Sequence, residues 1–140
     1  MATDSPKTEA PERQIVRAAG VGDVEQVQAL LAENPDLVRA RGAGSSTPLH
    51  AAVWKGKAAV VRLLLEAGAD VNAHNDNTHW GTTPLHAAAH SNRKGIAELL
   101  IAHGADVNAK NPDGVTPLAT THAHNATSAA KLLREHGATE

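Results

Sequence analysis

The sequence has no cysteine, phenylalanine or tyrosine, and only two tryptophans in 140 residues. Without cysteine the chain can form no disulfide, no thiol nucleophile and no cysteine-ligated zinc site. Apolar residues make up 41% of the chain, but 28 of them are alanines, so a core filled by large aromatic side chains is excluded. Helices that approach one another closely over small side chains fit this composition best.

Long apolar runs and an excess of positive charge are also missing. No stretch reaches the roughly 20 apolar residues that a membrane helix needs, and residues 1–12 lack the apolar core of a secretory signal. Thirteen lysines and arginines stand against fifteen aspartates and glutamates, a net charge of −2, which offers no general positive field to a phosphate backbone. We therefore expect a cytoplasmic chain that binds neither membranes nor nucleic acid.

Several motifs recur along the chain at a nearly constant interval. T-P-L-H stands at 47–50 and at 83–86, and T-P-L-A follows at 116–119. The hexapeptide G-A-D-V-N-A occurs at 68–73 and again at 104–109. A fainter unit precedes these three at one common offset, because Ala18, Ala19, Gly22, Val27, Leu30 and Leu31 match Ala52, Val53, Gly56, Val61, Leu64 and Leu65 in that order.

A period of roughly 33 residues that carries T-P-L-H, paired leucines and G-A-D-V-N-A resembles the ankyrin repeat. The resemblance covers about residues 13–138 and implies an all-α solenoid of stacked helix-turn-helix units with protruding hairpin loops. We expect a single domain over residues 13–140 after a flexible tail at residues 1–12, which has prolines and charges but no apolar period. The repeats are expected at about residues 13–45, 46–81, 82–114 and 115–140.

The residues themselves predict where the first helix of each unit begins. Thr47, Thr83 and Thr116 can cap a helix through the side-chain hydroxyl, and the proline after each suits the first helical position. The resemblance implies that His50 and His86 hydrogen-bond locally and to the next repeat, as the histidine of this motif does in ankyrin repeats. We expect these five residues to be structural.

Other residues predict helix ends and turns. Gly56, Asn92 and Asn125 are expected to end the first helices, because glycine and asparagine tolerate the left-handed conformation found there. Residues 111–114, N-P-D-G, have the preferences of a type I turn. Thr121 stands where the pattern has a small apolar residue, which is expected to weaken the packing of the last unit.

Nine histidines raise the question of a metal site. His86 and His90 are four residues apart on a predicted helix, a spacing that paired zinc ligands use, and His122 and His124 follow one unit later. The first pair has no third ligand in the sequence, and the resemblance implies that His86 is already engaged. We expect no metal and no cofactor, and we keep a histidine-based metal- or ligand-responsive module as an alternative function.

Motifs of the common enzyme classes are absent. The sequence has no G-x-S-x-G, no phosphate-binding P-loop and no H-E-x-x-H. Asp70 and Asp106 recur at equivalent positions after the second helix of their units. Recurrence favours a structural role in the turn, because a catalytic pair needs two carboxylates in different environments at one place. We expect no enzymatic activity.

Outward positions of the first helices form one candidate binding surface. Positions two, five and six residues after the buried leucine or isoleucine of each first helix point away from the helix pair. Trp54, Lys55, His90 and His124 stand there, and the resemblance implies that this concave face binds partners. Trp54 is the strongest candidate, although its indole could instead fold over neighbouring apolar side chains. The same positions also carry Arg17, Gly20, Val21, Ala51, Ala87, Ser91, Thr120 and Ala123.

The hairpin after the second unit is a second candidate, because it is longer than the others. Eleven positions separate the asparagine of G-A-D-V-N-A from the next T-P here, and eight in the following hairpin. The longer loop holds Asp76, His79 and Trp80, and loops on rigid scaffolds commonly carry binding. The alternative is a tolerated insertion whose Trp80 packs on its own hairpin, since lengthening a surface loop costs little.

Together these observations predict a protein-interaction module that binds a protein partner through the concave helical face and the long hairpin. Trp54 and Trp80 would supply buried area, the lysine and histidines would supply hydrogen-bond donors, and Asp76 would select a cationic group on the partner. A monomer is expected, because a capped solenoid has polar ends. A structural or engineered scaffold without a native partner is the remaining alternative.

Overall fold

The computed structural model describes residues 9–77, 82–123 and 125–139. Over these residues the chain forms four helix pairs and contains no strand. None of the described helices is long and apolar enough to cross a membrane. The elements are α1 (Pro11–Val21), α2 (Val24–Glu33), two short 3-10 helices (Pro35–Arg39 and Ala43–Ser45), α3 (Pro48–Lys55), α4 (Ala58–Glu66), α5 (Pro84–His90), α6 (Lys94–Ala102), α7 (Pro117–Ala123) and α8 (Thr127–Glu135).

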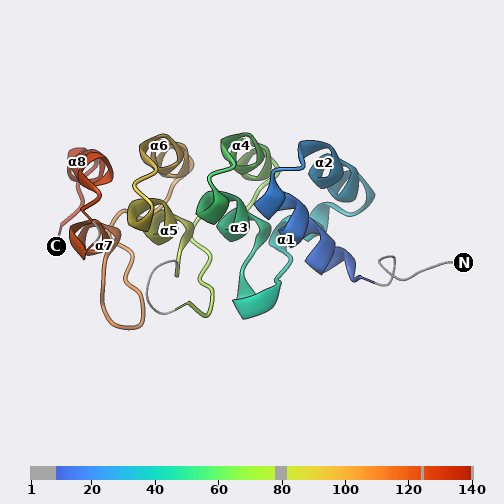
Figure 1. Cartoon of the computed structure of the whole chain (residues 1–140), viewed down its shortest axis with the longest axis horizontal. Coiled ribbons are helices and arrows are strands. Elements are labelled where there is room, and N and C mark those ends of the chain that lie inside the picture. Colours follow the sequence, from blue (N-terminus) through green and yellow to red (C-terminus); the bar gives the residue numbers. More distant parts are fainter. Residues whose placement is uncertain (1–8, 78–81, 124, 140) are drawn as a thin grey trace, which may run out of the picture.

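The helix pairs stack side by side into an elongated array. The first helices α1, α3, α5 and α7 form one row, and the second helices α2, α4, α6 and α8 form another row beside it (Figure 1). The connections between pairs protrude from the first row, away from the second row (Figure 1). This arrangement confirms the predicted all-α solenoid with protruding hairpin loops.

The core runs through the stack from one pair to the next. Each first helix places a fully buried leucine or isoleucine against its second helix, and alanines lie between neighbouring first helices, as the alanine-rich composition predicts. Burying one such leucine stabilises the fold by about 1.5–3 kcal/mol, and in stacked repeats much of this burial depends on the neighbouring unit. The fully buried aliphatic side chains include Ile15, Val27, Leu49, Leu64, Leu85, Leu100, Leu118 and Leu133.

The first helices begin where the T-P motif predicts. The backbone N–H of His50 donates to Thr47 Oγ1 over 3.3 Å, and that of His86 donates to Thr83 Oγ1 over 3.2 Å. In the last unit the N–H of Ala119 donates to Thr116 Oγ1 over 3.2 Å. Each threonine therefore satisfies a backbone donor that the helix leaves unpaired, and the proline after it has no N–H to satisfy.

The predicted ends of these helices are also confirmed. Gly56, Asn92 and Asn125 have φ angles of 75°, 54° and 55°, which is the left-handed conformation. Residues 111–114 form a turn closed by a hydrogen bond of 2.8 Å from the Gly114 N–H to the Asn111 carbonyl. Both features fix the direction in which the chain leaves one helix and enters the next.

The N-terminal boundary differs from the prediction, because α1 begins at Pro11, inside the segment expected to be a tail. Proline suits the first helical position, and Glu12 in the first turn interacts favourably with the helix dipole. The side chain of Gln14 also reaches back to donate to the Glu9 carbonyl over 2.6 Å. The first repeat therefore begins before residue 13, because Pro11 and Glu12 favour a helix start although they add no apolar residue to the pattern.

The last unit keeps its packing although it carries threonines at buried positions. Thr121 is buried, and its hydroxyl donates to the Leu118 carbonyl over 2.5 Å. Thr120 is also buried, and its hydroxyl donates to the Thr116 carbonyl over 3.2 Å. Because both hydroxyls are paired within the helix, their burial carries no penalty for an unmet hydrogen bond. We find the last helix pair stacked like the others.

Candidate functional site

His50 and His86 link each repeat to the next. One ring nitrogen of His50, Nδ1, lies 2.9 Å from Thr47 Oγ1, and the other, Nε2, lies 3.0 Å from the Thr82 carbonyl at the start of the next unit. His86 repeats the arrangement with Thr83 at 2.8 Å and the Val115 carbonyl at 2.8 Å. Both rings use both nitrogens for structure.

Burial keeps these two imidazoles neutral. It lowers the pKa of His50 to about 4, with a further contribution from the nearby Arg41 guanidinium, while the hydrogen bond to the Thr82 carbonyl acts in the opposite direction. Burial likewise lowers the pKa of His86, opposed by its hydrogen bond to the Val115 carbonyl. The neutral form matches the geometry, since a carbonyl accepts from Nε2–H and the threonine hydroxyl can donate to Nδ1.

The hydrogen bonds of His86 also argue against a metal site built on His86 and His90. His86 engages Val115 and Thr83, so its nitrogens do not converge with His90 on an ion. No group of three or more histidine, aspartate or glutamate side chains could hold a metal ion within the residues that the structure describes. His124 lies outside the described residues.

Trp54 lies in α3 and lines a hollow together with Asn75 and Asn77 of the long hairpin, and 37% of its surface is exposed. One part of its indole packs on His90 of the next unit, with ring centroids 5.2 Å apart and planes inclined by 38°. The two side chains proposed from the sequence as binding residues are therefore in contact, and Lys55 beside them is exposed. The indole is neither free on all sides nor folded into the core.

A groove of about 570 Å³ opens on the side of Trp54 that looks toward α1. Its walls come from α1, from α3, from Ala87 of α5 and from the two hairpins that follow α2 and α4. Its floor and rim combine an indole, small apolar side chains, cations and amides, which is the mixture that protein-binding surfaces use. The lining residues are Val16, Arg17, Gly20, Ala43, Ser46, His50, Ala51, Trp54, Lys55, Asn75, Asn77 and Ala87.

Gly20 keeps this groove open. It lies in α1 at the position that Trp54 occupies in α3, one repeat later. A Cβ atom at Gly20 would lie 3.7 Å from Ala51 Cβ and 3.8 Å from Lys55 Cγ, which is ordinary contact, so a larger side chain there would extend into the groove. Glycine within a helix costs about 1 kcal/mol relative to alanine. The sequence analysis placed Gly20 on the outward face but did not identify it as a site residue, because it has no functional group.

Two of the outward positions are covered rather than exposed. Ala87 and Thr120, two residues after the buried leucines of α5 and α7, are both buried. A helical period gives the direction of a side chain relative to one helix only, so it does not predict which positions the neighbouring repeats cover. The positions five and six residues after the leucine carry the accessible surface of α3.

The long hairpin is tied to the hairpin before it. The N–H of Asp76 donates to the Gly44 carbonyl over 2.8 Å, and the Arg41 guanidinium donates to the carbonyls of Ser45 and His74 over 2.8 and 2.5 Å. The Asp76 carboxylate is exposed. These bonds hold the two hairpins together along the groove. His79 and Trp80, which the sequence analysis proposed as binding residues, lie outside the described residues.

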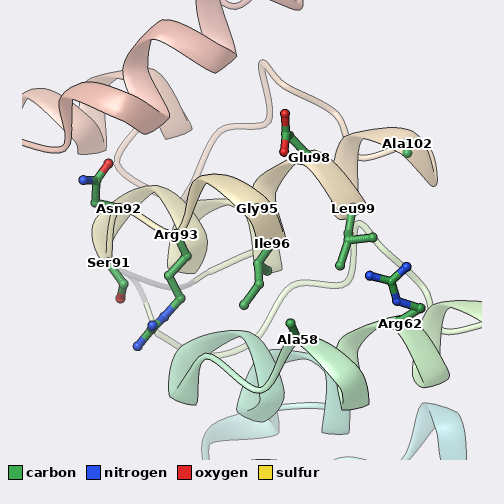
Figure 2. A pocket seen from close by; sticks show the side chains of 10 residues that line it. All are labelled: Ala58, Arg62, Ser91, Asn92, Arg93, Gly95, Ile96, Glu98, Leu99 and Ala102. Atoms are coloured by element: carbon green, nitrogen blue, oxygen red, sulfur yellow. The ribbon is translucent and has the colours of Figure 1, made fainter.

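A second hollow, of about 710 Å³, lies on the other side of the stack between α4 and α6. Figure 2 shows Ala58 and Ile96 facing each other across it, with Arg93 toward one end and Arg62 toward the other. Arg93 donates to the Trp54 carbonyl over 3.3 Å and so joins two repeats. The sequence analysis did not predict this hollow, because neither helix departs from the repeat pattern where they face each other.

Comparison with known proteins identifies the repeats. A family model described as ankyrin repeats in three copies matches residues 73–139, and a single ankyrin repeat model matches residues 45–76. Residues 11–33 precede both matches and form the same kind of helix pair, stacked on the next one. Ankyrin repeats are found in protein-interaction modules.

The curated relatives are longer proteins that share a short segment with this chain. The probable E3 ubiquitin-protein ligase XBOS32 of Oryza sativa subsp. japonica is 40% identical over 67 residues, which is 47% of this chain and 14% of that protein. The serine/threonine-protein kinase VIK of Arabidopsis thaliana is 51% identical over 53 residues, 38% of this chain and 12% of the kinase. The E3 ubiquitin-protein ligase XBAT32 of Arabidopsis thaliana is 39% identical over 67 residues, 47% of this chain and 13% of the ligase. With both family models matching and four stacked helix pairs, the chain belongs to the ankyrin repeat family.

Proposed function

We propose that this chain is a protein-binding module that holds a segment of its partner in the groove between α1 and α3. The observation that carries the proposal is a partly exposed indole, Trp54, beside a hollow that Gly20 leaves open. A partly exposed tryptophan that is fixed by a neighbouring ring offers apolar area at little further entropic cost.

Each predicted site residue has a place in this proposal. Trp54 and Trp80 supply apolar area, and Lys55 supplies a charged donor at the rim of the groove. The histidines His79, His90 and His124 supply further donors, and the exposed Asp76 carboxylate on the long hairpin can pair with a cation on the partner. His90 also holds the indole in position through their ring contact.

The proposal assigns recognition to this chain and no catalytic step. The two buried histidines are occupied by threonine hydroxyls and backbone carbonyls, which removes them as general bases or metal ligands. The ubiquitin ligases and the kinase share 12–14% of their length with it, so their activities give no ground for a catalytic role here. We propose further that the folded chain acts as a monomer.

Replacing Trp54 with alanine tests the proposal. Truncation of a tryptophan at the centre of an interface commonly costs more than about 2 kcal/mol, so we expect at least roughly 30-fold weaker binding of the partner. The measurement is capture of partners from cell extract on the immobilised protein, identification by mass spectrometry, and titration of the purified partner by calorimetry.

The matched control is Val21→Ala. Val21 is the other large apolar side chain that is exposed in the described part of the chain, at 63%, and it does not line the groove. We expect Val21→Ala to bind the partner as the unaltered protein does. Equal capture by both variants, with unchanged helical circular dichroism, would reject the groove as the binding site.

A further inference from the structure

We propose that the partner segment in this groove is acidic and carries at least one apolar side chain. The inference rests on the proposed function and adds the chemical class of the partner. It follows from where the cations of the chain lie, although the net charge of the whole chain is −2.

Four exposed cations line the groove or the hollow that adjoins it. A third hollow, of about 510 Å³, has Arg13, Arg17 and Arg41 in its lining, and it shares Val16, Arg17 and Ala43 with the groove beside Trp54. Lys55, in α3, lines the groove itself. Neither hollow has a carboxylate among its described lining residues, and the Glu9 carboxylate, which pairs with Arg17, would compete with an acidic segment for that cation.

Arg17 already binds one carboxylate. The side chain of Glu9, just before α1, pairs with the Arg17 guanidinium through Nη2 and lies 3.4 Å from its Nε. The pairing raises the pKa of Arg17 and lowers the pKa of Glu9, chiefly through their hydrogen bond. The guanidinium is therefore oriented to receive a carboxylate with two of its nitrogens, and an exposed pair of this kind exchanges easily for another.

Arg41 is fixed in place rather than free to move. Its Nη1 donates to the Ser45 and His74 carbonyls, which leaves the rest of the guanidinium at the hollow. The groove is also lined by three apolar side chains, Val16, Ala51 and Trp54, which apolar side chains of a partner can contact. An extended segment that alternates carboxylates with apolar side chains can contact both kinds of lining residue. A nucleic acid would match the cations but would leave most of the apolar floor unused, since Trp54 is the only aromatic ring besides His50 that lines the described groove.

The test uses three fluorescein-labelled peptides of about 12 residues, in which leucines alternate with glutamate, glutamine or lysine, and a labelled single-stranded DNA. Fluorescence anisotropy with the full chain gives the Kd of each at about 50 mM and about 300 mM NaCl. We expect the glutamate peptide to bind at least roughly tenfold more tightly than the glutamine peptide at low salt, and the advantage to shrink at high salt. The lysine peptide should bind least.

Three variants locate the effect. In Arg13→Gln/Arg17→Gln/Lys55→Gln the preference for glutamate over glutamine should disappear. Arg62→Gln/Lys94→Gln/Arg134→Gln removes three exposed cations elsewhere and should retain it. Glu9→Gln removes the competing carboxylate and should tighten binding of the glutamate peptide about two- to threefold, which a merely structural role of the ion pair would not produce.

Several results would overturn the proposal: equal affinity for the glutamate and glutamine peptides, no measurable binding of the glutamate peptide, an equal loss in the control triple variant, or tighter binding of the DNA. These results concern the charge of the partner alone. If they occur while Trp54→Ala still abolishes partner capture, the groove remains the binding site and only its acidic specificity is wrong. If capture is independent of Trp54, the proposed function itself fails.

Discussion

Acidification from about pH 6.5 to about pH 4 is expected to lower the free energy of unfolding by on the order of 3 kcal/mol through His50 alone. The figure follows from a pKa lowered from 6.5 to about 4 in the folded chain, at about 1.4 kcal/mol per unit. Natural domains are stable by only about 5–15 kcal/mol, so this is a large fraction of the total.

The hydrogen bonds around His50 explain why the folded chain resists protonation. Nε2 faces the Thr82 carbonyl and so carries the proton, which leaves Nδ1 as the acceptor for the N–H and hydroxyl of Thr47. A second proton on Nδ1 would face a backbone donor and would place a charge in a buried site. The ring therefore stays neutral until the pH approaches 4.

The direction of the pH effect follows from the lowered pKa. Above the unfolded-state value of 6.5 the ring is neutral in both states, and its contribution to stability is fully present. Below that value the unfolded chain takes up a proton that the folded chain refuses, so stability falls as the pH drops toward 4. His86, whose pKa burial also lowers, acts in the same direction.

Urea unfolding at a series of pH values measures this effect. The control variant is His136→Gln, which removes an exposed histidine and leaves His50 in place. His50→Gln should flatten the slope of stability against pH between about pH 6.5 and about pH 4.5 by close to one proton, whatever it does to stability at neutral pH. An unchanged slope in His50→Gln would contradict the assignment of the neutral, buried ring.

Leu100→Ala is expected to destabilise the protein by about 2–5 kcal/mol, because it removes a fully buried side chain and leaves a cavity. Leu100 lies in α6 and belongs to the core that runs through the stack. Since neighbouring pairs share this core, a defect in the third pair should lower the melting temperature of the whole chain in one transition.

Leu99→Ala is the matched control. Leu99 is the same residue type, one position earlier on α6, but it is only partly buried and lines the hollow between α4 and α6 (Figure 2). We expect it to cost less than about 1.5 kcal/mol, in proportion to the smaller apolar area that it buries. Thermal and urea unfolding compare the two variants. Equal losses would contradict the assignment of Leu100 to the shared core and of Leu99 to its edge.

The sequence was sufficient for the fold because each repeat carries its own start and stop signals. Thr47 and Thr83 cap helices as predicted, and Gly56 and Asn92 end them in the left-handed conformation. These signals act within a few residues, so they can be read without knowing the tertiary structure.

The candidate site could be predicted only in part, because it depends on contacts between repeats. The sequence placed Trp54 and His90 on one outward face, but their ring contact depends on how far one repeat is offset from the next. It gave no signal for Gly20, whose contribution to the groove is the absence of a side chain. Thr121, which was expected to weaken packing, is buried, and its hydroxyl donates to a carbonyl within its own helix, a pairing that the repeat pattern did not predict.

The cluster of positive charge beside the groove also could not be predicted from the sequence. Arg13 and Arg17 come from α1 and their neighbour Arg41 comes from the hairpin after α2, and the net charge of the chain is negative. Only the stacking of the first pair on the second brings these side chains to one hollow. The electrostatic potential at one place on the surface depends on which charged side chains the fold brings together there.

The most direct test of the central claim is the affinity of the purified partner for Gly20→Met compared with Gly20→Ala. The alanine methyl meets Ala51 and Lys55 at ordinary contact distance, so Gly20→Ala should bind normally and gain about 0.5–1 kcal/mol in stability. The methionine side chain extends into the groove and should weaken binding roughly tenfold or more while the helices stay folded. Equal affinity of the two folded variants would mean that partners bind elsewhere on the stack.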